Sequence, residues 1–218
     1  MKIEIWSDIA CPFCYIGKRH LEQALDQFKH ADEVDVVWHS FELDPEAKTE
    51  TDKNIYEKLA SKYGQSLEWA KQANEDLKQK AADVGIEFNP EKIIPTNSFD
   101  AHRLIKLADE YGLEDEAEEQ LFNAYFTEGK NISNYDTLRQ IGATLGLGKD
   151  DVETMLESEQ YSDDVRRDEK EAQQIGVRGV PFFVLNRKYA ISGAQPVHTF
   201  VEALEKCYAD EQKQAVEN

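Results

Sequence analysis

The sequence predicts an α/β fold in which a single sheet carries a large, all-helical insertion. Three observations predict it: a strand–helix–strand pattern at the N-terminus, a long run of helical patterns after it, and two short strand-like runs before a last helix. The order is β-α-β, the helical insertion, and then α-β-β-α. Each strand-bearing piece is too small to bury a core alone, so we expect both pieces to build one sheet.

The N-terminal strand–helix–strand unit contains a pair of closely spaced cysteines. Ile3 and Ile5 indicate the first strand, and residues 34–39, rich in β-branched and aromatic side chains, indicate the second. Between these strands, positions at spacings of three and four mark one helix face: Gly17, His20, Leu21, Ala24, Leu25 and Phe28. The sequence Cys-Pro-Phe-Cys at residues 11–14 therefore stands where the first strand passes into this helix.

The middle of the chain is predicted to be helical throughout. We predict helices at 54–63, 66–84, 98–112, 114–128, 134–146 and 149–158, separated by glycine and proline turn signals. Ser133 followed by Asp136 resembles the capping-box start of one of these helices. We predict that residues 1–48 and 162–218 form the sheet-bearing domain and that residues 49–161 form the inserted helical subdomain.

Strand character returns in the last third of the chain. Residues 180–186 (Val-Pro-Phe-Phe-Val-Leu-Asn) and 189–193 (Tyr-Ala-Ile-Ser-Gly) form two runs joined by a short turn, as in a hairpin. Pro196 then opens a last helix, since proline is well tolerated at the first helical position. Its inner face is predicted to carry Val197, Phe200, Val201 and Leu204.

The charge of the chain limits its partners. The 218 residues carry a formal net charge of −19, which disfavours nucleic acid and anionic lipid as partners. The acidic residues are scattered along helical stretches, as expected of a solvated surface. No stretch approaches the roughly 20 apolar residues of a membrane span, and no apolar secretory segment follows Met1. We therefore expect a cytoplasmic protein, as a monomer or a homodimer, with no membrane or nucleic-acid partner.

Cys11 and Cys14 have the spacing of a redox-active pair. Cytosolic thiols are mostly reduced, so this spacing suggests catalysis or metal binding there rather than a structural disulfide. Pro12 suits the first helical turn, and the helix N-terminus offers unpaired N–H groups and partial positive charge. Both features stabilise a thiolate on Cys11, the predicted attacking group, while Cys14 lies one turn further in and resolves the mixed disulfide.

The alternative interpretation of the cysteine pair is half of a zinc site. Structural zinc needs four ligands, usually including a second close pair. The only other cysteine is Cys207, which we interpret as a buried small hydrophobe or a surface bystander, and the histidines are scattered. We therefore predict no metal and no resident cofactor beyond the two thiols.

Val180-Pro181 is the second candidate feature. A proline that opens a strand-like run cannot donate to the sheet at that position. A cis bond would turn the Val180 backbone toward an extended peptide or thiol substrate. From spacing alone, an ordinary trans proline at a strand start is the favoured interpretation.

Four segments together resemble DsbA-family oxidoreductases of the FrnE type. They are the cysteine segment 6–17, the segment 97–104, the proline segment 176–183 and the segment 191–196 before the last helix. The resemblance spans nearly the whole chain in the family's order. It implies a thioredoxin-like fold with a helical insertion, Cys11 as nucleophile, Cys14 as resolving thiol and a cis bond at Val180-Pro181.

The sequence departs from the pattern of related enzymes at informative positions. Phe13 stands where the periplasmic DsbA enzymes typically have a histidine. Ile5 stands where thioredoxins carry a buried acid, and Glu4 and Asp8 are the nearest acids. Cys207 has no partner for the second cysteine pair of some FrnE-type proteins. The resemblance therefore leaves the direction of electron transfer open.

Glutathione-linked enzymes on the same scaffold provide the main alternative function. Kappa-class glutathione transferases and 2-hydroxychromene-2-carboxylate isomerases typically have serine at the first cysteine position and a Ser-Asp pair near the last helix. This chain has Cys11 and Ala194-Gln195 at those places, so both differences favour disulfide exchange. A third hypothesis is a non-catalytic DsbA-like adaptor that binds a partner through its acidic helical insertion.

We therefore expect a dithiol–disulfide oxidoreductase or isomerase that acts on protein or low-molecular-weight thiols. Glutathione is a possible small-molecule partner, and the recycling reductant or oxidant is unknown. Pro12, Phe13, Val180 and Pro181 are predicted to line the substrate site. His102 either lines the groove beside the cysteines or is a packed helix histidine, and packing is the favoured interpretation.

Overall fold

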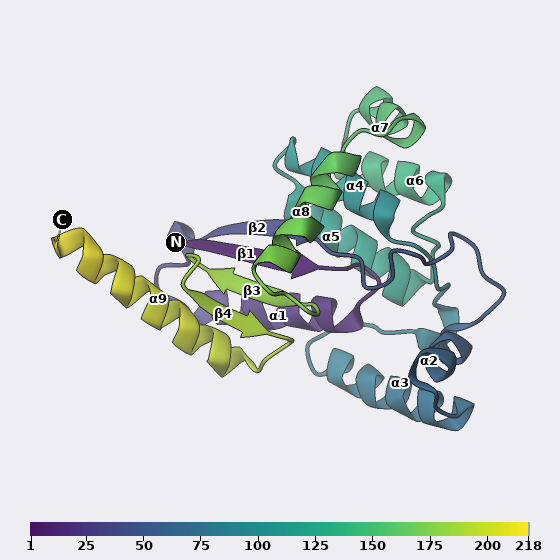
Figure 1. Ribbon diagram of the computed structural model, residues 1–218, viewed down its shortest axis with the longest axis horizontal. Coiled ribbons are helices and arrows are strands. Elements are labelled where there is room, and N and C mark those ends of the chain that lie inside the picture. Colours follow the sequence, from purple (N-terminus) through teal and green to yellow (C-terminus); the bar gives the residue numbers. More distant parts are fainter. Residues whose placement is uncertain (218) are drawn as a thin grey trace.

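In the computed structural model, a four-stranded mixed sheet lies at the centre of the protein. The order of its strands is β2-β1-β3-β4. The structure describes the backbone of residues 1–217 and the side chains of residues 1–213. Strand β1 (Lys2–Ser7) pairs parallel with β2 (Asp35–Ser40) and antiparallel with β3 (Phe182–Leu185), which pairs antiparallel with β4 (Tyr189–Ser192). The two ends of the chain thus build one sheet, which confirms the predicted fold class (Figure 1).

Helices cover both faces of this sheet. Helix α1 (Pro12–Gln27) and helix α9 (Val197–Glu217) pack on one face, where Ile3 and Ile5 of β1 meet apolar side chains of both helices. Helix α8 (Ser162–Gln174) covers the other face (Figure 1), where Ala172 packs against Trp6 of β1. The alternation along β1 follows from the two-residue period of a strand.

The inserted segment is helical, as predicted. It contains α2 (Ile55–Tyr63), α3 (Leu67–Ala82), α4 (Phe99–Asp109), α5 (Glu114–Phe122), α6 (Tyr135–Leu145) and α7 (Lys149–Glu157). Short 3₁₀ turns occur at Ala31–Glu33 and Pro90–Lys92. The predicted helix 114–128 is not uniform, because its last part, Asn123–Glu128, is a π-helix. The division into domains at residues 49 and 161 stays a prediction.

The predicted capping box of α6 was wrong by one residue. The N-cap is Asn134, whose side-chain oxygen accepts hydrogen bonds from the N–H groups of Asp136 and Thr137. The Ser133 hydroxyl instead donates to the carbonyl oxygen of Asn97, at 2.6 Å. Asparagine is as good an N-cap as serine, so the tertiary bond of Ser133 decides between them.

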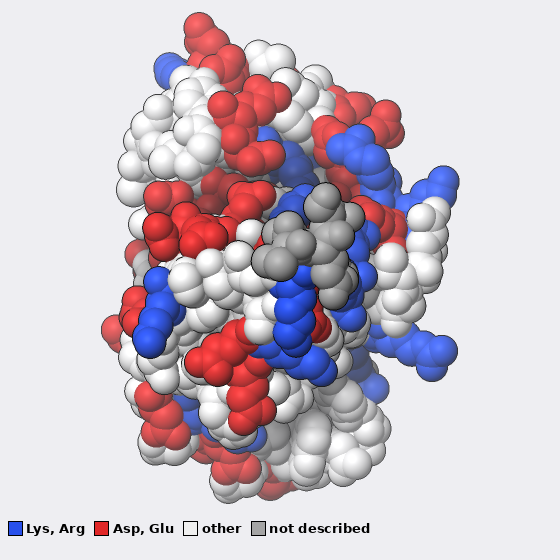
Figure 2. All heavy atoms as spheres, turned by 90° about the vertical axis from the view of Figure 1, so that its left-hand side faces the viewer, with Lys and Arg blue, Asp and Glu red and all other residues white. Residues whose placement is uncertain are grey.

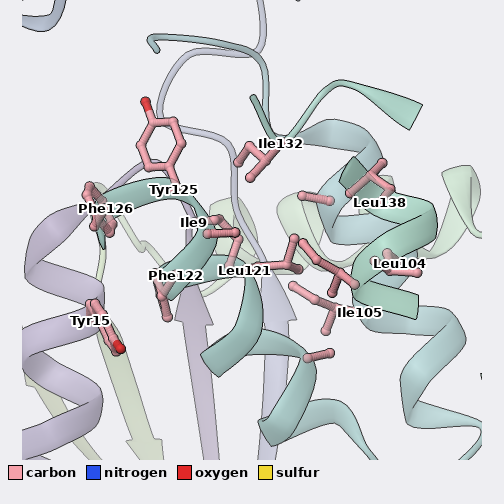
Figure 3. Packing of buried hydrophobic residues seen from close by; sticks show 14 of the residues in the cluster. Ile9, Tyr15, Leu104, Ile105, Leu121, Phe122, Tyr125, Phe126, Ile132 and Leu138 are labelled. Atoms are coloured by element: carbon pink, nitrogen blue, oxygen red, sulfur yellow. The ribbon is translucent and has the colours of Figure 1, made fainter. Parts of the chain in front are cut away.

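The insertion shares its core with the segment that carries the cysteines. Ile9 lies among Phe122, Leu121 and other side chains of the insertion, and the Tyr15 ring stacks on Phe122 with 4.8 Å between ring centroids (Figure 3). Cys11 and Cys14 belong to the same buried cluster. Because this core is continuous, the helices of the insertion help to hold the cysteine loop in place.

Charged side chains of the helices close the free edge of β2. The Trp38 N–H donates to Oε2 of Glu114 at 3.1 Å, and Nζ of Lys106 donates to the Trp38 carbonyl at 2.9 Å. Lys106 also pairs with Asp168 at 2.7 Å, and Asp168 accepts the Ser40 N–H at 2.9 Å. The edge strand is thereby protected from pairing with another chain.

The surface carries both signs of charge. On the face shown in Figure 2, acidic residues gather in several clusters with lysines and arginines between them. Within the residues that the structure describes, no helix is both long enough and apolar enough to span a membrane.

We predict that Glu114→Gln makes stability less sensitive to pH. Burial raises the pKa of Glu114 from 4.5 to about 7, so the unfolded chain releases this proton at lower pH than the native protein. Stability is therefore lost as pH rises through this window, by an amount on the order of 3 kcal/mol. The amide oxygen of the new glutamine would keep an acceptor for the Trp38 N–H. In urea unfolding, the free energy of unfolding of the variant should rise relative to that of the wild type between pH 5 and pH 8.

Glu116→Gln provides the matched control, because Glu116 is an exposed carboxylate on the same helix. It removes the same charge without the buried site. If the free energies of unfolding of Glu114→Gln and the wild type differ by the same amount at pH 5 and at pH 8, the prediction is wrong.

Candidate active site

The cysteine pair lies at the start of α1, as the sequence predicted. Cys11 is the N-cap residue, with extended backbone dihedrals, and Pro12 occupies the first helical position. The Cys11 N–H donates to the Asp8 carbonyl at 2.9 Å, and the Cys14 N–H donates to the Cys11 carbonyl at 3.0 Å. No acidic residue stands in the first turn. The positive end of α1 therefore lies at Cys11, without a neighbouring carboxylate in that turn.

Cys14 lies deeper than Cys11 and in a different environment. Its exposed fraction is 1%, against 4% for Cys11. Burial and the neighbouring Cys11 sulfur raise the pKa of Cys14 well above its usual range, while the Asp8 N–H and the Ser7 hydroxyl lower it in part. Cys14 therefore stays a thiol under conditions in which Cys11 can react.

The proline segment approaches both Cys11 and the first turns of α1. The Val180-Pro181 bond is cis, and the Cys11 Sγ lies 3.6 Å from the Val180 carbonyl oxygen. A Cβ atom on Gly17 would stand 3.0 Å from Pro181 Cγ and 3.1 Å from the end of the Phe183 ring. Glycine at position 17 thus allows α1 to approach Pro181 closely.

A groove of about 630 Å³ opens beside Cys11. Its lining includes Cys11, Pro12 and Val180 together with side chains of α2 and α3. Apolar side chains dominate the lining, with Phe13 and Trp69 respectively 46% and 40% exposed. The other apolar residues of the lining are Ala10, Leu43, Ile55, Leu59, Tyr63, Ala73, Leu77, Phe88, Ile93, Tyr125 and Phe126, and its charged residues are Lys62, Asp76 and Lys80.

A buried carboxylate fixes the loop that precedes Cys11. Asp8 accepts the Ala10 N–H on Oδ1 at 3.0 Å and the Leu43 N–H on Oδ2 at 2.7 Å. Nε2 of His102, from α4, lies 3.6 Å from Asp8 Oδ1, and both side chains are 1% exposed. Although burial opposes its charge, His102 and the two amides lower the pKa of Asp8. The loop is therefore tied to Leu43 by a hydrogen bond and lies against His102 of the insertion.

Tyr125 lies on the groove side of this pair. In Figure 3 its hydroxyl points away from the apolar cluster that surrounds Ile9. Burial and the charge of Asp8 raise the pKa of Tyr125. Tyr125 therefore stays a neutral phenol at the groove wall.

The groove contains only some of the sequence-predicted residues. Cys11, Pro12, Phe13 and Val180 line it, whereas Cys14 and Pro181 are not among its lining residues. His102 is not among the lining residues and is a packed helix histidine, and Cys207 is a buried thiol in the core between α1 and α9. Gln195 turns back on its own loop, with Nε2 donating to the Ser192 carbonyl. Among the described residues, no group of three or more His, Cys, Asp and Glu side chains is placed to hold a metal ion.

Sequence reasoning missed the buried hydroxyl of Ser7 and the partner of Asp8. Ser7 is fully buried at the end of β1, and its hydroxyl is near enough to Cys14 to lower the pKa of that thiol. A serine at a strand end gives no signal of such a contact. For Asp8 there was a signal, because an acidic residue between the first strand and Cys11 indicates a carboxylate that could bind the loop backbone.

A cysteine pair at the start of the first helix, opposite a cis-proline on a sheet of this order, defines a thioredoxin-like fold. The chain belongs to the DSBA-like thioredoxin domain family, which it matches over residues 2–205. This confirms the resemblance to DsbA-family oxidoreductases and supports thiol–disulfide oxidoreductase activity at the level of the family.

Two similar proteins match almost the whole chain. A probable DsbA oxidoreductase from Streptomyces coelicolor, of known crystal structure, is 39% identical, with 96% of this chain and 90% of that chain covered and a TM-score of 0.92. The uncharacterized protein YwbO of Bacillus subtilis is 29% identical over 213 residues, 97% of each chain.

More distant structures share the fold. The cytosolic disulfide reductase DsbM from Pseudomonas aeruginosa is 17% identical, with all of both chains covered and a TM-score of 0.62. A 2-hydroxychromene-2-carboxylate isomerase is 18% identical, with 100% of this chain and 98% of that chain covered and a TM-score of 0.62. At this identity, the likeness extends to the fold alone.

We predict that Asp8 and His102 contribute to stability as a pair. His102→Leu keeps an apolar volume but removes the polar ring beside the buried Asp8 carboxylate, which costs about 1–3 kcal/mol. Asp8→Asn removes that charge, so the double variant should be more stable than the two single losses imply, by ~1–3 kcal/mol. Urea unfolding of the four proteins measures this coupling, and strictly additive losses would contradict it.

Proposed function

We propose that this protein is a dithiol–disulfide oxidoreductase that works through Cys11 and Cys14. The observation that supports it most is the placement of Cys11, which caps α1 at the floor of an apolar groove and lies 3.6 Å from the Val180 carbonyl. A thiolate at a helix N-terminus is both a nucleophile and a good leaving group.

The proposed reaction has two exchange steps. The Cys11 thiolate attacks one sulfur of a substrate disulfide, a Cys11–substrate disulfide forms, and the other substrate sulfur leaves as a thiolate. Cys14 then attacks the Cys11 sulfur, the Cys11–Cys14 bond forms, and the second substrate thiolate is released. The reverse sequence oxidises a substrate dithiol. Reduction and oxidation use the same contacts, and the recycling partner sets the direction.

The groove beside Cys11 indicates which kind of substrate group would lie next to the reacting sulfur. Its volume suits a substrate group larger than a single side chain, and its apolar wall favours an apolar part of that group. Pro12, Phe13, Val180 and Pro181 are proposed to position the substrate at the sulfur. Protein disulfides with a neighbouring apolar side chain fit this site, and so do low-molecular-weight disulfides of comparable size.

The structural relatives support a small-thiol partner and a cytoplasmic location. The DsbM disulfide reductase is a cytosolic protein, and one of its structures contains glutathione. We propose that this chain also acts in the cytoplasm and exchanges with small thiols, using its own cysteine pair and no other cofactor.

We predict that Cys11→Ser abolishes disulfide reduction, because the attacking thiolate is lost. Cys14→Ser should instead form a stable mixed disulfide at Cys11, since the resolving thiol is missing. Insulin reduction with dithiothreitol and mass spectrometry of the trapped adduct measure the two effects. Cys207→Ser is the matched control, because it removes a buried thiol that lies outside the groove. Equal insulin reduction by the wild type and Cys11→Ser would refute the proposed function.

A further inference from the structure

The second exchange step requires a thiolate on Cys14, but Cys14 is buried, and burial disfavours the charged form of a thiol. Cys14 is 1% exposed, and burial raises its pKa well above the usual range. Its attack on the Cys11–substrate disulfide nevertheless proceeds through a sulfur that carries negative charge. The environment of Cys14 must therefore supply stabilisation that bulk water cannot provide there.

Asp8 is poorly suited to act as the base for this step. Both of its carboxylate oxygens already accept backbone N–H groups, and His102 lies on the Oδ1 side. These contacts lower the pKa of Asp8, which makes it a weak proton acceptor. Ser7 stands two residues after Ile5 and therefore on the face of β1 that packs against α1, the helix that carries Cys14. The Ser7 hydroxyl and the Asp8 backbone N–H also lower the pKa of Cys14.

Ser7 has no other evident role for its hydroxyl. It is the last residue of β1, its exposed fraction is 0%, and its Oγ makes no hydrogen bond of ordinary geometry with any described group. A buried hydroxyl without a partner carries a free-energy penalty, so an unpartnered one beside a reactive sulfur suggests that the sulfur is its partner during the reaction.

We propose that the Ser7 hydroxyl is a further catalytic group, which together with the Asp8 N–H forms a two-donor site for the Cys14 thiolate. This inference rests on the proposed function. The donors are fixed by the end of β1 and by the loop that Asp8 anchors. Because they are oriented before the reaction and lie away from water, they stabilise charge without reorganising during the step.

The exchange balances without an added oxidant or reductant. The Cys14 sulfur forms a bond to the Cys11 sulfur, the bond between Cys11 and the substrate sulfur breaks, and the departing sulfur takes the electron pair. The proton that Cys14 releases goes to the departing thiolate, directly or through solvent. Ser7 loses no proton in the cycle, because a hydroxyl can accept from a thiol and donate to a thiolate by rotating.

The experiment separates the two exchange steps in rapid-mixing measurements. Reduced wild type and Ser7→Ala are mixed with a disulfide whose first leaving thiol is chromophoric, and acid-quenched samples are analysed by mass spectrometry for the Cys11 adduct. We expect the first thiol to be released at the same rate by both proteins. We expect the adduct to decay about 10-fold or more slowly in Ser7→Ala, with the pH dependence of decay moved to higher pH.

Ser40→Ala is the matched control. Ser40 pairs with Ser7 across β1 and β2, and its hydroxyl is equally buried and unpartnered. Its adduct should decay as fast as that of the wild type. Equal decay in Ser7→Ala and the wild type would overturn the inference, and so would equal slowing by both substitutions, which would indicate packing. If the wild type forms no Cys11 adduct, the proposed function itself fails.

Discussion

The contacts of Asp8 hold the active-site loop in its working shape. This carboxylate lies between the end of β1 and the start of α1, and it binds the N–H groups of Ala10 and Leu43 and pairs with His102. The Asp8 carbonyl accepts the Cys11 N–H. A single residue therefore connects the sheet, the cysteine loop, the segment after β2 and the helical insertion. Because its charge is buried, the loop cannot move far without losing compensated charge.

The environments of the two thiols differ because Cys11 lies at the end of α1 and Cys14 lies within its first turn. Cys11 caps α1 and faces the groove, whereas Cys14 lies one turn further in, against the end of β1. The N-terminal end of α1 lies at the Cys11 sulfur, whereas burial raises the pKa of Cys14. The insertion supplies the groove wall opposite Cys11 and also packs on the loop from behind. The groove and the position of the loop thus depend on the same helical insertion.

Much of this architecture is predictable from the sequence, because period and turn signals reflect local structure. The strands, the predicted helices and the Cys11 cap lie close to where the patterns predict them. The π-helix at Asn123–Glu128 was not predicted, since it continues the apolar pattern of α5. The Asn134 cap was missed because the Ser133 hydroxyl is engaged by a residue far away in the chain.

The site was less predictable than the fold, because its decisive contacts are tertiary. His102 and Asp8 lie far apart in the sequence, and spacing alone cannot pair them. The spacing around Pro181 favoured a trans bond, and only the resemblance to the DsbA family indicated the cis bond that the structure contains. Ser7 carries no pattern that marks a functional residue, and its place on the α1 side of the sheet follows from how β1 meets α1.

We expect the position of Cys11 at the helix end and the burial of Cys14 to give the two thiols unequal reactivity. Site-resolved alkylation of the reduced wild type with iodoacetamide, followed by peptide mass spectrometry between pH 5 and pH 8, tests it directly. We expect Cys11 to be modified at least ~10-fold faster than Cys14 and Cys207 throughout this range. Modification of Cys14 or Cys207 as fast as Cys11 would contradict it.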